Sequence, residues 1–191
     1  MRKALRVMDF WFGARTSPDY GHSRKPWFEK SDTFDRDIRE RFGHLQAQAA
    51  AGRLDAWQAN SKSALALIIL LDQLPRNMHR GSPKAFACDS KALGVARFAI
   101  SRRFDRVLLP VERWFVYLPF EHAEDLAMQR ESLRLFAGLG FDPESAGAID
   151  YARRHFDIIA RFGRFPHRND ILGRISSADE TEFLGQPGSG F

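Results

Sequence analysis

Two segments of the chain combine arginine, asparagine and histidine directly after an apolar run and a proline. Residues 71–80 read LDQLPRNMHR, and residues 161–174 read RFGRFPHRNDILGR. Arginine presents a planar fork that suits carboxylates and phosphates. Asparagine donates and accepts hydrogen bonds at once, and histidine exchanges protons near neutral pH. We therefore expect the two segments to contribute to one polar site.

A third polar group is expected at the start of a helix predicted over residues 121–138. On a wheel of about 100° per residue, His122, Asp125 and Gln129 share the apolar stripe of this helix. A buried polar group without a hydrogen-bond partner costs about 1–3 kcal/mol. These side chains must therefore bond to one another or line a cavity.

The residues assigned to the site lie on the apolar face of a predicted helix or just beyond its end. The predicted ligand-binding residues are Asp72, Gln73, Arg76, Asn77, Arg80, Glu121, Asp125, Gln129, His155, Arg161, Arg164, Arg168 and Asn169. His122 and His167 are the candidate catalytic residues, because either could act as a general base.

Three functions fit this set of residues. In the leading interpretation, arginines bind an anionic small molecule or peptide. In the second, the protein is a hydrolase in which His122 or His167 is the general base and arginines stabilise developing negative charge. In the third, the residues form a structural network inside an interaction scaffold, because Arg and Asn after a helix end often bond its free carbonyls. The sequence leaves open whether the protein is an enzyme.

No metal or cofactor site is predicted. His122, Asp125, His155 and His167 are of ligand type, but a pair of such residues on one helical face is common by chance. The glycine-containing stretches FGRF and GLGF do not follow a strand, so they do not indicate a phosphate-binding loop. Cys88 has no Cys or His partner at motif spacing and is expected to be a buried apolar residue.

Helical periodicity predicts the elements that position these residues. Helices are expected over residues 32–51, 55–74, 83–103, 110–117, 121–138 and 142–162, with short helices near 167–173 and 177–184. Asp32 is the expected N-cap of the first, and Pro75 and Pro119 are expected to end the second and the fourth. The run ALALIILL at 64–71 is apolar all round, so its helix should be the most buried.

The fold class that follows is all-α, because clean strand alternation is absent. Several helices can pair as antiparallel hairpins, which favours a compact bundle or a short repeat-like stack. The 191 residues are predicted to form a single domain over 1–184 with a flexible tail at 185–191 that is rich in Gly and Pro. Phe191 is predicted to dock in an apolar recess, with its carboxylate near an arginine.

Composition limits the partners that we expect. The net charge of +5 comes from 29 basic and 24 acidic residues. The basic residues are dispersed, so no nucleic-acid partner is predicted. A single cysteine, the absence of a signal peptide and a longest apolar run of eight residues predict a cytoplasmic protein without a membrane span. The oligomeric state is left open.

Several segments resemble a known family. They are MDFWFG (8–13), PWFEKSDTFDRDIRERFG (26–43), LALIILLDQLPRNMHRGSPKAFACDSKAL (65–93), YLPFEHAEDLAMQRESLRLF (117–136), HFDIIARFGRFPHRNDILGR (155–174) and PGSGF (187–191). Together they resemble the uncharacterised bacterial domain-of-unknown-function family 924. The resemblance implies an all-helical fold similar to tetratricopeptide repeats, and it implies no reaction. One departure is Gly190, where the family usually shows a serine.

Overall fold

The computed structural model describes residues 2–190, and this part of the chain contains helices and loops but no β-strand. The all-α prediction is therefore confirmed. The α-helices are α1 (Arg2–Phe12), α2 (Asp32–Ala50), α3 (Ser61–Ile68), α4 (Leu74–Met78), α5 (Asp89–Ser101), α6 (Pro110–Glu121), α7 (Leu126–Ala137), α8 (Ala146–Phe162) and α9 (Ala178–Leu184). Short 3₁₀ turns occupy Lys25–Trp27, Asp55–Ala59, Pro83–Ala85, Phe104–Val107, Pro143–Ser145 and Pro166–Arg168.

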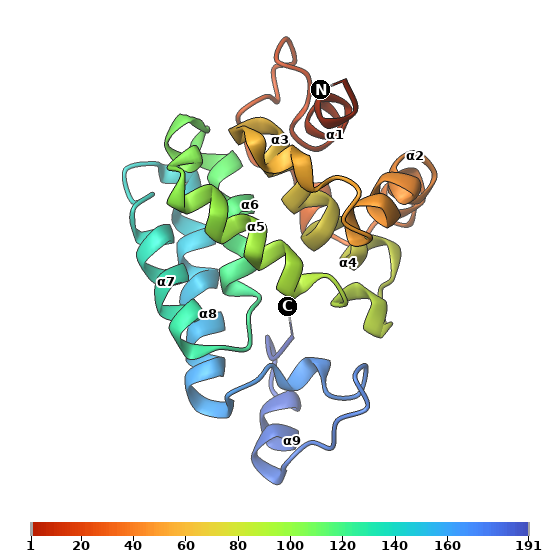
Figure 1. Ribbon diagram of the computed structural model, residues 1–191. Coiled ribbons are helices and arrows are strands. Elements are labelled where there is room, and N and C mark those ends of the chain that lie inside the picture. Colours follow the sequence, from red (N-terminus) through yellow and green to blue (C-terminus); the bar gives the residue numbers. More distant parts are fainter. Residues whose placement is uncertain (1, 191) are drawn as a thin grey trace.

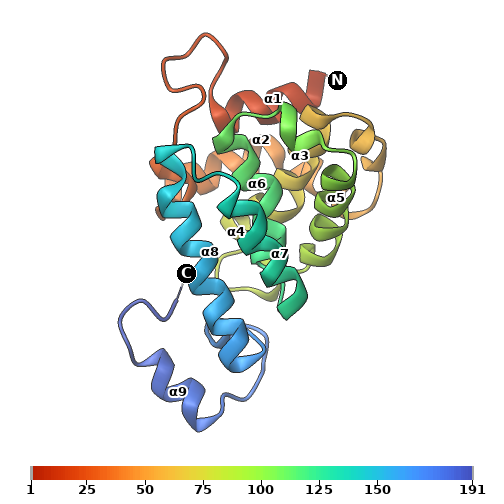
Figure 2. The same ribbon diagram turned by 90° about the vertical axis from the view of Figure 1, so that its left-hand side faces the viewer.

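The helices pack largely in chain order. Contacts run from α1 to α3, from α3 to α5, and then successively through α6 and α7 to α8. Figure 1 shows α1 and α2 at one side of the molecule and the α7–α8 pair at the other, with α3 to α6 between them. In both Figure 1 and Figure 2, α9 lies apart from this helical body, and the chain that follows α9 runs back toward it.

The centre of the fold is one continuous helical rod over residues 61–78. It consists of α3, a π-helical turn at Ile69–Gln73 and α4. Every side chain from Ala64 to Leu71 is fully buried, which confirms the prediction that this segment is the most buried. The rod begins at Ser61 rather than at residue 55, because Asn60 caps it by accepting a hydrogen bond from the backbone N–H of Ser63.

The expectation that Pro75 ends this rod was wrong. The π-helical turn stands just before the proline, and there the backbone N–H of Leu74 bonds to the carbonyl of Ile69, five residues earlier. The wider turn changes the backbone spacing just where the proline ring would clash with a carbonyl of a regular α-helix. The helix therefore continues to Met78 and carries Arg76 and Asn77 on its last turn.

Pro119 does not end its helix either, because α6 runs from Pro110 to Glu121. A proline inside a helix costs about 3 kcal/mol. Almost the whole helix is buried, including Phe115 and Phe120, and this packing outweighs the lost hydrogen bond. Regular bonding resumes when the backbone N–H of His122 donates to the carbonyl of Leu118 at 2.8 Å.

The helix predicted over residues 121–138 begins only at Leu126. Asp125 is its N-cap and accepts a hydrogen bond from the backbone N–H of Met128 at 2.9 Å. Asp caps a helix better than it extends one, because its side chain satisfies a free N–H. His122 therefore stands at the end of α6, and its predicted wheel position on α7 was wrong.

Three other boundaries also differ from the sequence prediction. The N-cap of α2 is Ser31 and not Asp32. The third predicted helix divides into a 3₁₀ turn at Pro83–Ala85 and α5, which starts at Asp89. Only the 3₁₀ turn Pro166–Arg168 lies near the short helix expected at 167–173. A capping serine defines the start of α2, and prolines define the starts of the two 3₁₀ turns.

Large rings join α1 to α6 in the core. Phe115 is fully buried, and its ring centroid lies 5.3 Å from that of Phe12 and 4.9 Å from that of Trp27. Both pairs are edge-to-face, the arrangement that aromatic quadrupoles favour. The ring of Trp11 packs edge-on against Phe115 as well, at 5.6 Å. This cluster holds the N-terminal helix against the helix whose far end enters the candidate site.

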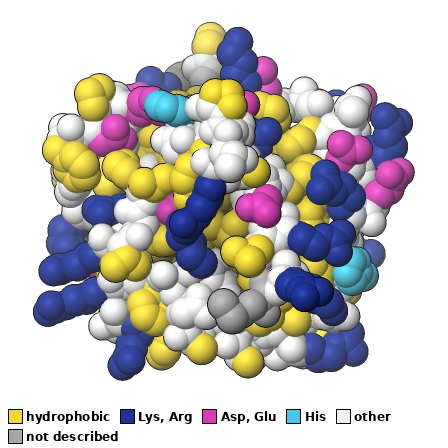
Figure 3. Space-filling view, turned by 90° about the horizontal axis from the view of Figure 1, so that it is seen from above, with side chains coloured by type: hydrophobic (Ala, Val, Ile, Leu, Met, Phe, Trp, Pro, Cys, Tyr) yellow, Lys and Arg dark blue, Asp and Glu magenta, His cyan; other side chains and the backbone are white. Residues whose placement is uncertain are grey.

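The surface carries mixed charge. Figure 3, which views the end that carries α1, shows Lys and Arg side chains spread among acidic and hydrophobic ones. Within residues 2–190, no helix combines the length and the apolar character that crossing a bilayer requires. In the tail, the Ser189 hydroxyl donates to the carbonyl of Leu184 at 3.1 Å. Phe191, for which docking is predicted, lies outside the described residues.

Candidate functional site

The centre of the candidate site is Asp72, which lies in the π-helical turn and is fully buried. Its Oδ1 lies 2.8 Å from Nδ1 of His122, at the end of α6. Its Oδ2 accepts a hydrogen bond from Nε2 of Gln73 at 2.6 Å. Nη1 of Arg76, one turn further on, donates to the Asp72 carbonyl at 2.7 Å and lies 3.5 Å from Oδ1. Asp72 thus joins the central rod to α6.

Arg76 also connects this centre to the first residue of α5. Its two terminal nitrogens donate to the two carboxylate oxygens of Asp89 at 2.8 and 2.9 Å. Such a bidentate pair is strong and directional. Asp89 is favourably placed at a helix N-terminus, where the helix dipole stabilises negative charge. The charge of Arg76 is therefore shared between two carboxylates.

Arg168 approaches the same carboxylate less closely. Its Nη1 lies 3.5 Å from Oδ2 of Asp89. The guanidinium carbon lies 4.6 Å from the ring centroid of Phe86 and 4.5 Å from that of Phe165. The residue is 6% exposed, and its Nε has no hydrogen-bond partner in the described part of the chain. Arg168 is a buried cation held mainly by aromatic faces.

A second acid–histidine pair lies next to the first. Oε1 of Glu121 is 3.1 Å from Nδ1 of His155 on α8, and that nitrogen donates to the Tyr151 carbonyl at 2.9 Å. Oε2 of Glu121 is buried and has no hydrogen-bond partner among residues 2–190. The side-chain amide of Gln129 donates to the carbonyls of Glu121 and Ala123, which fixes the end of α6.

Burial and neighbouring charge set the protonation of these groups. Burial raises the pKa of Glu121 well above its ordinary value, and the charge of Asp72 raises it further. Burial lowers the pKa of His155 to about 3, and burial together with Arg76 lowers the pKa of His122. Burial opposes ionisation of Asp72, but Arg76 and His122 hold its pKa below its ordinary value. These shifts favour the ionised form of Asp72 and the neutral form of both imidazoles near neutral pH, and they oppose ionisation of Glu121.

A pocket of about 430 Å³ opens beside this network. We call it the Arg168 pocket, and its lining residues are Pro83, Phe86, Ala87, Asp89, Ser90, Leu93, Pro119, His122, Ala123, Glu124, Arg168 and Leu172. Apolar side chains form most of this lining, with a few charged or polar groups among them, as in ligand sites generally. His122 and Arg168 are the two predicted site residues that line it.

Glu124 lies at the pocket wall and is fully engaged. It accepts a hydrogen bond from the backbone N–H of Phe165 at 2.8 Å and a bidentate pair from Arg174 at 2.6 and 2.9 Å. Although burial opposes its ionisation, these contacts lower the pKa of Glu124. The pair ties the loop after α8 to the end of α6, and Arg168 projects from that loop.

Other predicted site residues lie elsewhere, each with a nearer partner. Asn77 and Arg80 both bond to Asp35 of α2. Arg164 forms a bidentate pair with Glu180 of α9 at 2.7 and 2.8 Å. An arginine pairs with the carboxylate that lies closest to it in the folded chain. The sequence does not show which carboxylate that is.

The remaining predicted residues have local roles. Asp125 is exposed and caps α7. Arg161 is exposed and lies over the Phe162 ring at 4.5 Å. The amide of Asn169 donates to the Ser176 hydroxyl at 3.0 Å. The ring centroid of His167 lies 5.6 Å from that of Phe165, and burial lowers its pKa to about 4, but His167 is not among the pocket's lining residues.

Sequence reasoning missed Asp89, Phe86, Glu124 and Arg174 as members of the site. Asp89 had a detectable signal, because it lies near the start of the helix predicted over 83–103, where the helix dipole favours an acidic side chain. Phe86 gave no signal in the sequence, since an aromatic residue in a loop belongs to the hydrophobic core as often as to a binding site. The partnership of Glu124 with Arg174 spans fifty residues and becomes visible only in the folded chain.

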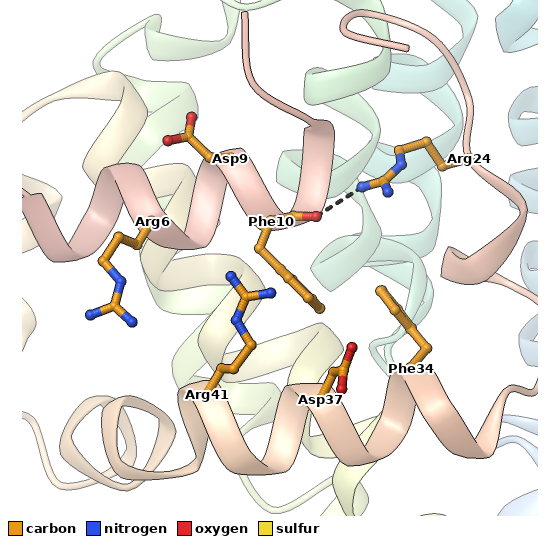
Figure 4. A pocket seen from close by; sticks show the side chains of 7 residues that line it. All are labelled: Arg6, Asp9, Phe10, Arg24, Phe34, Asp37 and Arg41. Carbon is orange, nitrogen blue, oxygen red and sulfur yellow. Dashed lines mark hydrogen bonds between the residues drawn. The ribbon is translucent and has the colours of Figure 1, made fainter. Parts of the chain in front are cut away.

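A second hollow of about 510 Å³ lies between α1 and α2. Figure 4 shows its lining residues, among them Phe10 with the guanidinium of Arg41 beside its ring. That guanidinium lies 4.6 Å from the ring centroid, and Arg24 donates to the Phe10 carbonyl at 2.8 Å. Arg6, Asp9 and Arg41 are exposed there. Exposed charges of both signs do not make a selective site, so the Arg168 pocket is the better candidate.

Fold and site together define an all-helical protein in which three distant segments of the chain meet at one buried charge network. The chain belongs to a family of bacterial proteins of unknown function, DUF924, whose family model matches residues 7–188. Its fold is similar to the solved structure of a protein of unknown function, ATU0120, from Agrobacterium tumefaciens. The two share 39% sequence identity with a TM-score of 0.86 over 96% of this chain and 97% of the other. No curated protein matches the chain.

Proposed function

We propose that the protein binds a small anionic molecule or an anionic peptide group in the Arg168 pocket. The observation that carries this proposal is the state of Arg168 itself. It is a pocket-lining cation, 6% exposed, whose nearest carboxylate oxygen is 3.5 Å away. Its Nε has no hydrogen-bond partner among the described residues. A carboxylate or phosphate would supply the charge-assisted hydrogen bonds that this guanidinium lacks.

Arg76 does not fill this role, although it lies nearby. Its nitrogens already bond to both oxygens of Asp89 and to the carbonyl of Asp72. An anion would have to displace these bonds to bind it. Burial and the charge of Arg76 lower the pKa of Arg168 only to about 10, so Arg168 remains a cation near neutral pH.

Two carboxylates also line the pocket, and both are neutralised by arginine. Asp89 is paired with Arg76, and Glu124 is paired with Arg174. The charges in these bidentate pairs largely cancel, so they oppose an incoming anion little. Arg168 is the pocket-lining cation that no carboxylate pairs at short range, since its nearest contact to Asp89 is 3.5 Å. The apolar walls formed by Phe86, Leu93 and Leu172 suit a ligand that has an apolar part beside its anionic group.

Calorimetric titration with inorganic phosphate, short carboxylates and phosphorylated small molecules tests the proposal, in buffer that contains a chelator. We expect one of these probes to bind with 1:1 stoichiometry and Arg168→Ala to weaken that binding at least about tenfold, the effect of losing one charge-assisted contact. Arg161→Ala is the matched control, because Arg161 is exposed and outside the pocket. Equal binding by wild type and Arg168→Ala would refute the assignment.

The second candidate function is hydrolysis with His122 as general base. The 2.8 Å contact between Nδ1 of His122 and the buried carboxylate of Asp72 favours it, because such a contact orients an imidazole and leaves Nε2 as the nitrogen for proton transfer. His167 is the weaker base candidate, since it does not line the pocket. Turnover of ester, phosphoester or amide substrates that disappears in His122→Gln would support this function, and turnover unchanged in that variant would remove His122 from it.

We propose a tetratricopeptide-repeat-like stacking of helical hairpins, supported by the contacts between successive helices from α5 to α8. Residues 1–184 are proposed to form one domain and 185–191 a flexible tail, in a cytoplasmic protein without nucleic-acid or membrane partners. If no small anion binds, the third interpretation stands, in which the network around Asp72 stiffens an interaction scaffold.

A further inference from the structure

Three residues beside the Arg168 pocket have potential metal-ligating atoms close to one another. One ligand atom from each of Glu121, His122 and His155 lies within 4.8 Å of the other two. The three side chains come from the adjoining positions at the end of α6 and from the middle of α8. We propose that they bind a divalent first-row transition-metal ion, with zinc as the reference case. This site is separate from anion binding by Arg168 and does not depend on it.

The unsatisfied oxygen of Glu121 is the first observation in favour of this site. The Glu121 side chain is 3% exposed, and its Oε2 has no hydrogen-bond partner within residues 2–190. The arginines of the network, Arg76 and Arg168, contact Asp89. A buried carboxylate oxygen without a partner is costly. A metal ion would supply both the missing contact and the counter-charge.

The second observation is the arrangement behind the two histidines. Nδ1 of His122 is held by Asp72, which leaves Nε2 as the nitrogen that can bind a metal. Metal-bound histidines usually donate their other ring N–H to a carboxylate or a backbone carbonyl, which orients the ring. Asp72 provides the carboxylate for His122, and the carbonyl of Tyr151 accepts from Nδ1 of His155. Both histidines therefore have the outer partners typical of metal ligands.

The distances require only a small closure. Zinc binds nitrogen and oxygen ligands at about 2.0–2.2 Å, so tetrahedral ligand atoms lie about 3.4 Å apart. The ligand atoms now lie within 4.8 Å of one another, so binding would require them to approach by about 1.4 Å at most. Three protein ligands leave a fourth position open, as in catalytic rather than structural zinc sites. Because His122 lines the Arg168 pocket, a metal ion held by it would lie beside that pocket.

The local charges are compatible with a dication. Asp72 and Asp89 are balanced by Arg76 and Arg168, and Glu121 adds a further negative charge when it ionises. The ligand set of two imidazoles and one carboxylate suits zinc, iron(II) or cobalt(II) better than calcium or magnesium, which prefer all-oxygen sites.

Zinc titration of untagged, chelator-stripped protein tests the proposal. Metal content after desalting should reach about one zinc per chain, and cobalt should give the visible absorption bands of a low-symmetry site. Glu121→Gln removes a ligand without changing the side chain's shape and should abolish stoichiometric binding. Asp72→Asn, which acts through His122, should weaken binding about 10–100-fold. His44→Gln, an exposed histidine on α2, is the control and should bind as wild type does.

Two results would overturn the assignment. One is sub-stoichiometric zinc, iron(II) and cobalt in the wild-type protein. The other is binding that Glu121→Gln leaves unchanged, which would place the metal elsewhere. Thermal melts of each variant without metal show whether it is folded, so a lost site is not confused with a lost fold. Because anion binding is measured in chelator, either proposal can fail while the other stands.

Discussion

Arg76 and Asp89 face each other through two parallel hydrogen bonds, Nη1 to Oδ1 at 2.8 Å and Nη2 to Oδ2 at 2.9 Å. The same Nη1 also donates to the carbonyl of Asp72 at 2.7 Å. One guanidinium therefore holds the central helical rod and the start of α5 together. Arg168 reaches Asp89 only at 3.5 Å. The two arginines of one network thus have different roles, and that difference can be measured.

Arg76→Ala and Arg168→Ala should differ in their effect on stability. Arg76→Ala leaves two carboxylates without their cation and should lower the free energy of unfolding by about 3–5 kcal/mol, as in other broken buried pairs. Arg168→Ala removes a poorly bonded cation between two rings and should cost only about 1–2 kcal/mol. Urea unfolding of the two variants measures both values. Equal losses would show that Arg168 is as structurally bound as Arg76.

The hydrogen bonds from Arg80 and Asn77 to Asp35 should make the free energy of unfolding depend on pH in the acid range. Burial opposes ionisation of Asp35, but hydrogen bonds from Arg80 and Asn77 lower its pKa below the ordinary 3.8. A lowered pKa in the folded state adds stability above the unfolded-state pKa, and this stability is lost as pH falls through the folded-state value. The difference in unfolding free energy between wild type and Asp35→Asn should therefore shrink on acidification from neutral pH. A difference in unfolding free energy that stays constant as the pH falls would contradict this role of Asp35.

Asp125 is predicted to act as a helix cap and not as a ligand-binding residue. Asp125→Ala removes the bond to the backbone N–H of Met128 and should cost about 1 kcal/mol of stability. Asp125→Ser should restore most of that loss, because serine caps equally well. Anion binding should remain as in wild type in both variants. Weaker anion binding with unchanged stability would show instead that Asp125 contributes to ligand binding.

Phe115 is predicted to be the most costly aromatic residue to truncate. Its ring contacts those of Trp11, Phe12 and Trp27 in the buried core, so Phe115→Ala should cost about 3–5 kcal/mol. Phe141→Ala is the control, since that ring is 68% exposed, and it should change stability by no more than about 0.5 kcal/mol. Calorimetric melting of both variants gives the comparison. Similar melting temperatures would mean that the cluster does not stabilise the fold.

Local patterns predicted most of the helices but misplaced the ends that matter for the site. Pro75 and Pro119 were predicted to end their helices because a proline has no backbone N–H to donate. Whether a helix continues through a proline depends on a wider turn before it, or on burial that outweighs the loss, and both are properties of the packed chain. Asp125 was predicted to belong to a polar stripe on a helix, whereas its side chain caps the start of α7.

The candidate site was predicted in part for a similar reason. Asp72, Arg76, His122 and Arg168 were found because they are polar groups at apolar faces or helix ends. Asn77, Arg80 and Arg164 share that signal and bond elsewhere. Residue type determines what an arginine can bind, but the nearest carboxylate decides what it does bind. That carboxylate is often on another helix.

The sequence by itself determined the all-helical class, the burial of the segment at 64–71 and the family, because periodicity, apolar runs and long motifs are local properties of the chain. Only the tertiary structure decided which charges meet. Asp72 and His122 lie fifty residues apart in the chain, and Glu121 and His155 thirty-four. Their contacts follow from how α6 packs against the central rod and α8, since a hydrogen bond needs its donor and acceptor within about 3.2 Å and the attraction between charges weakens with distance.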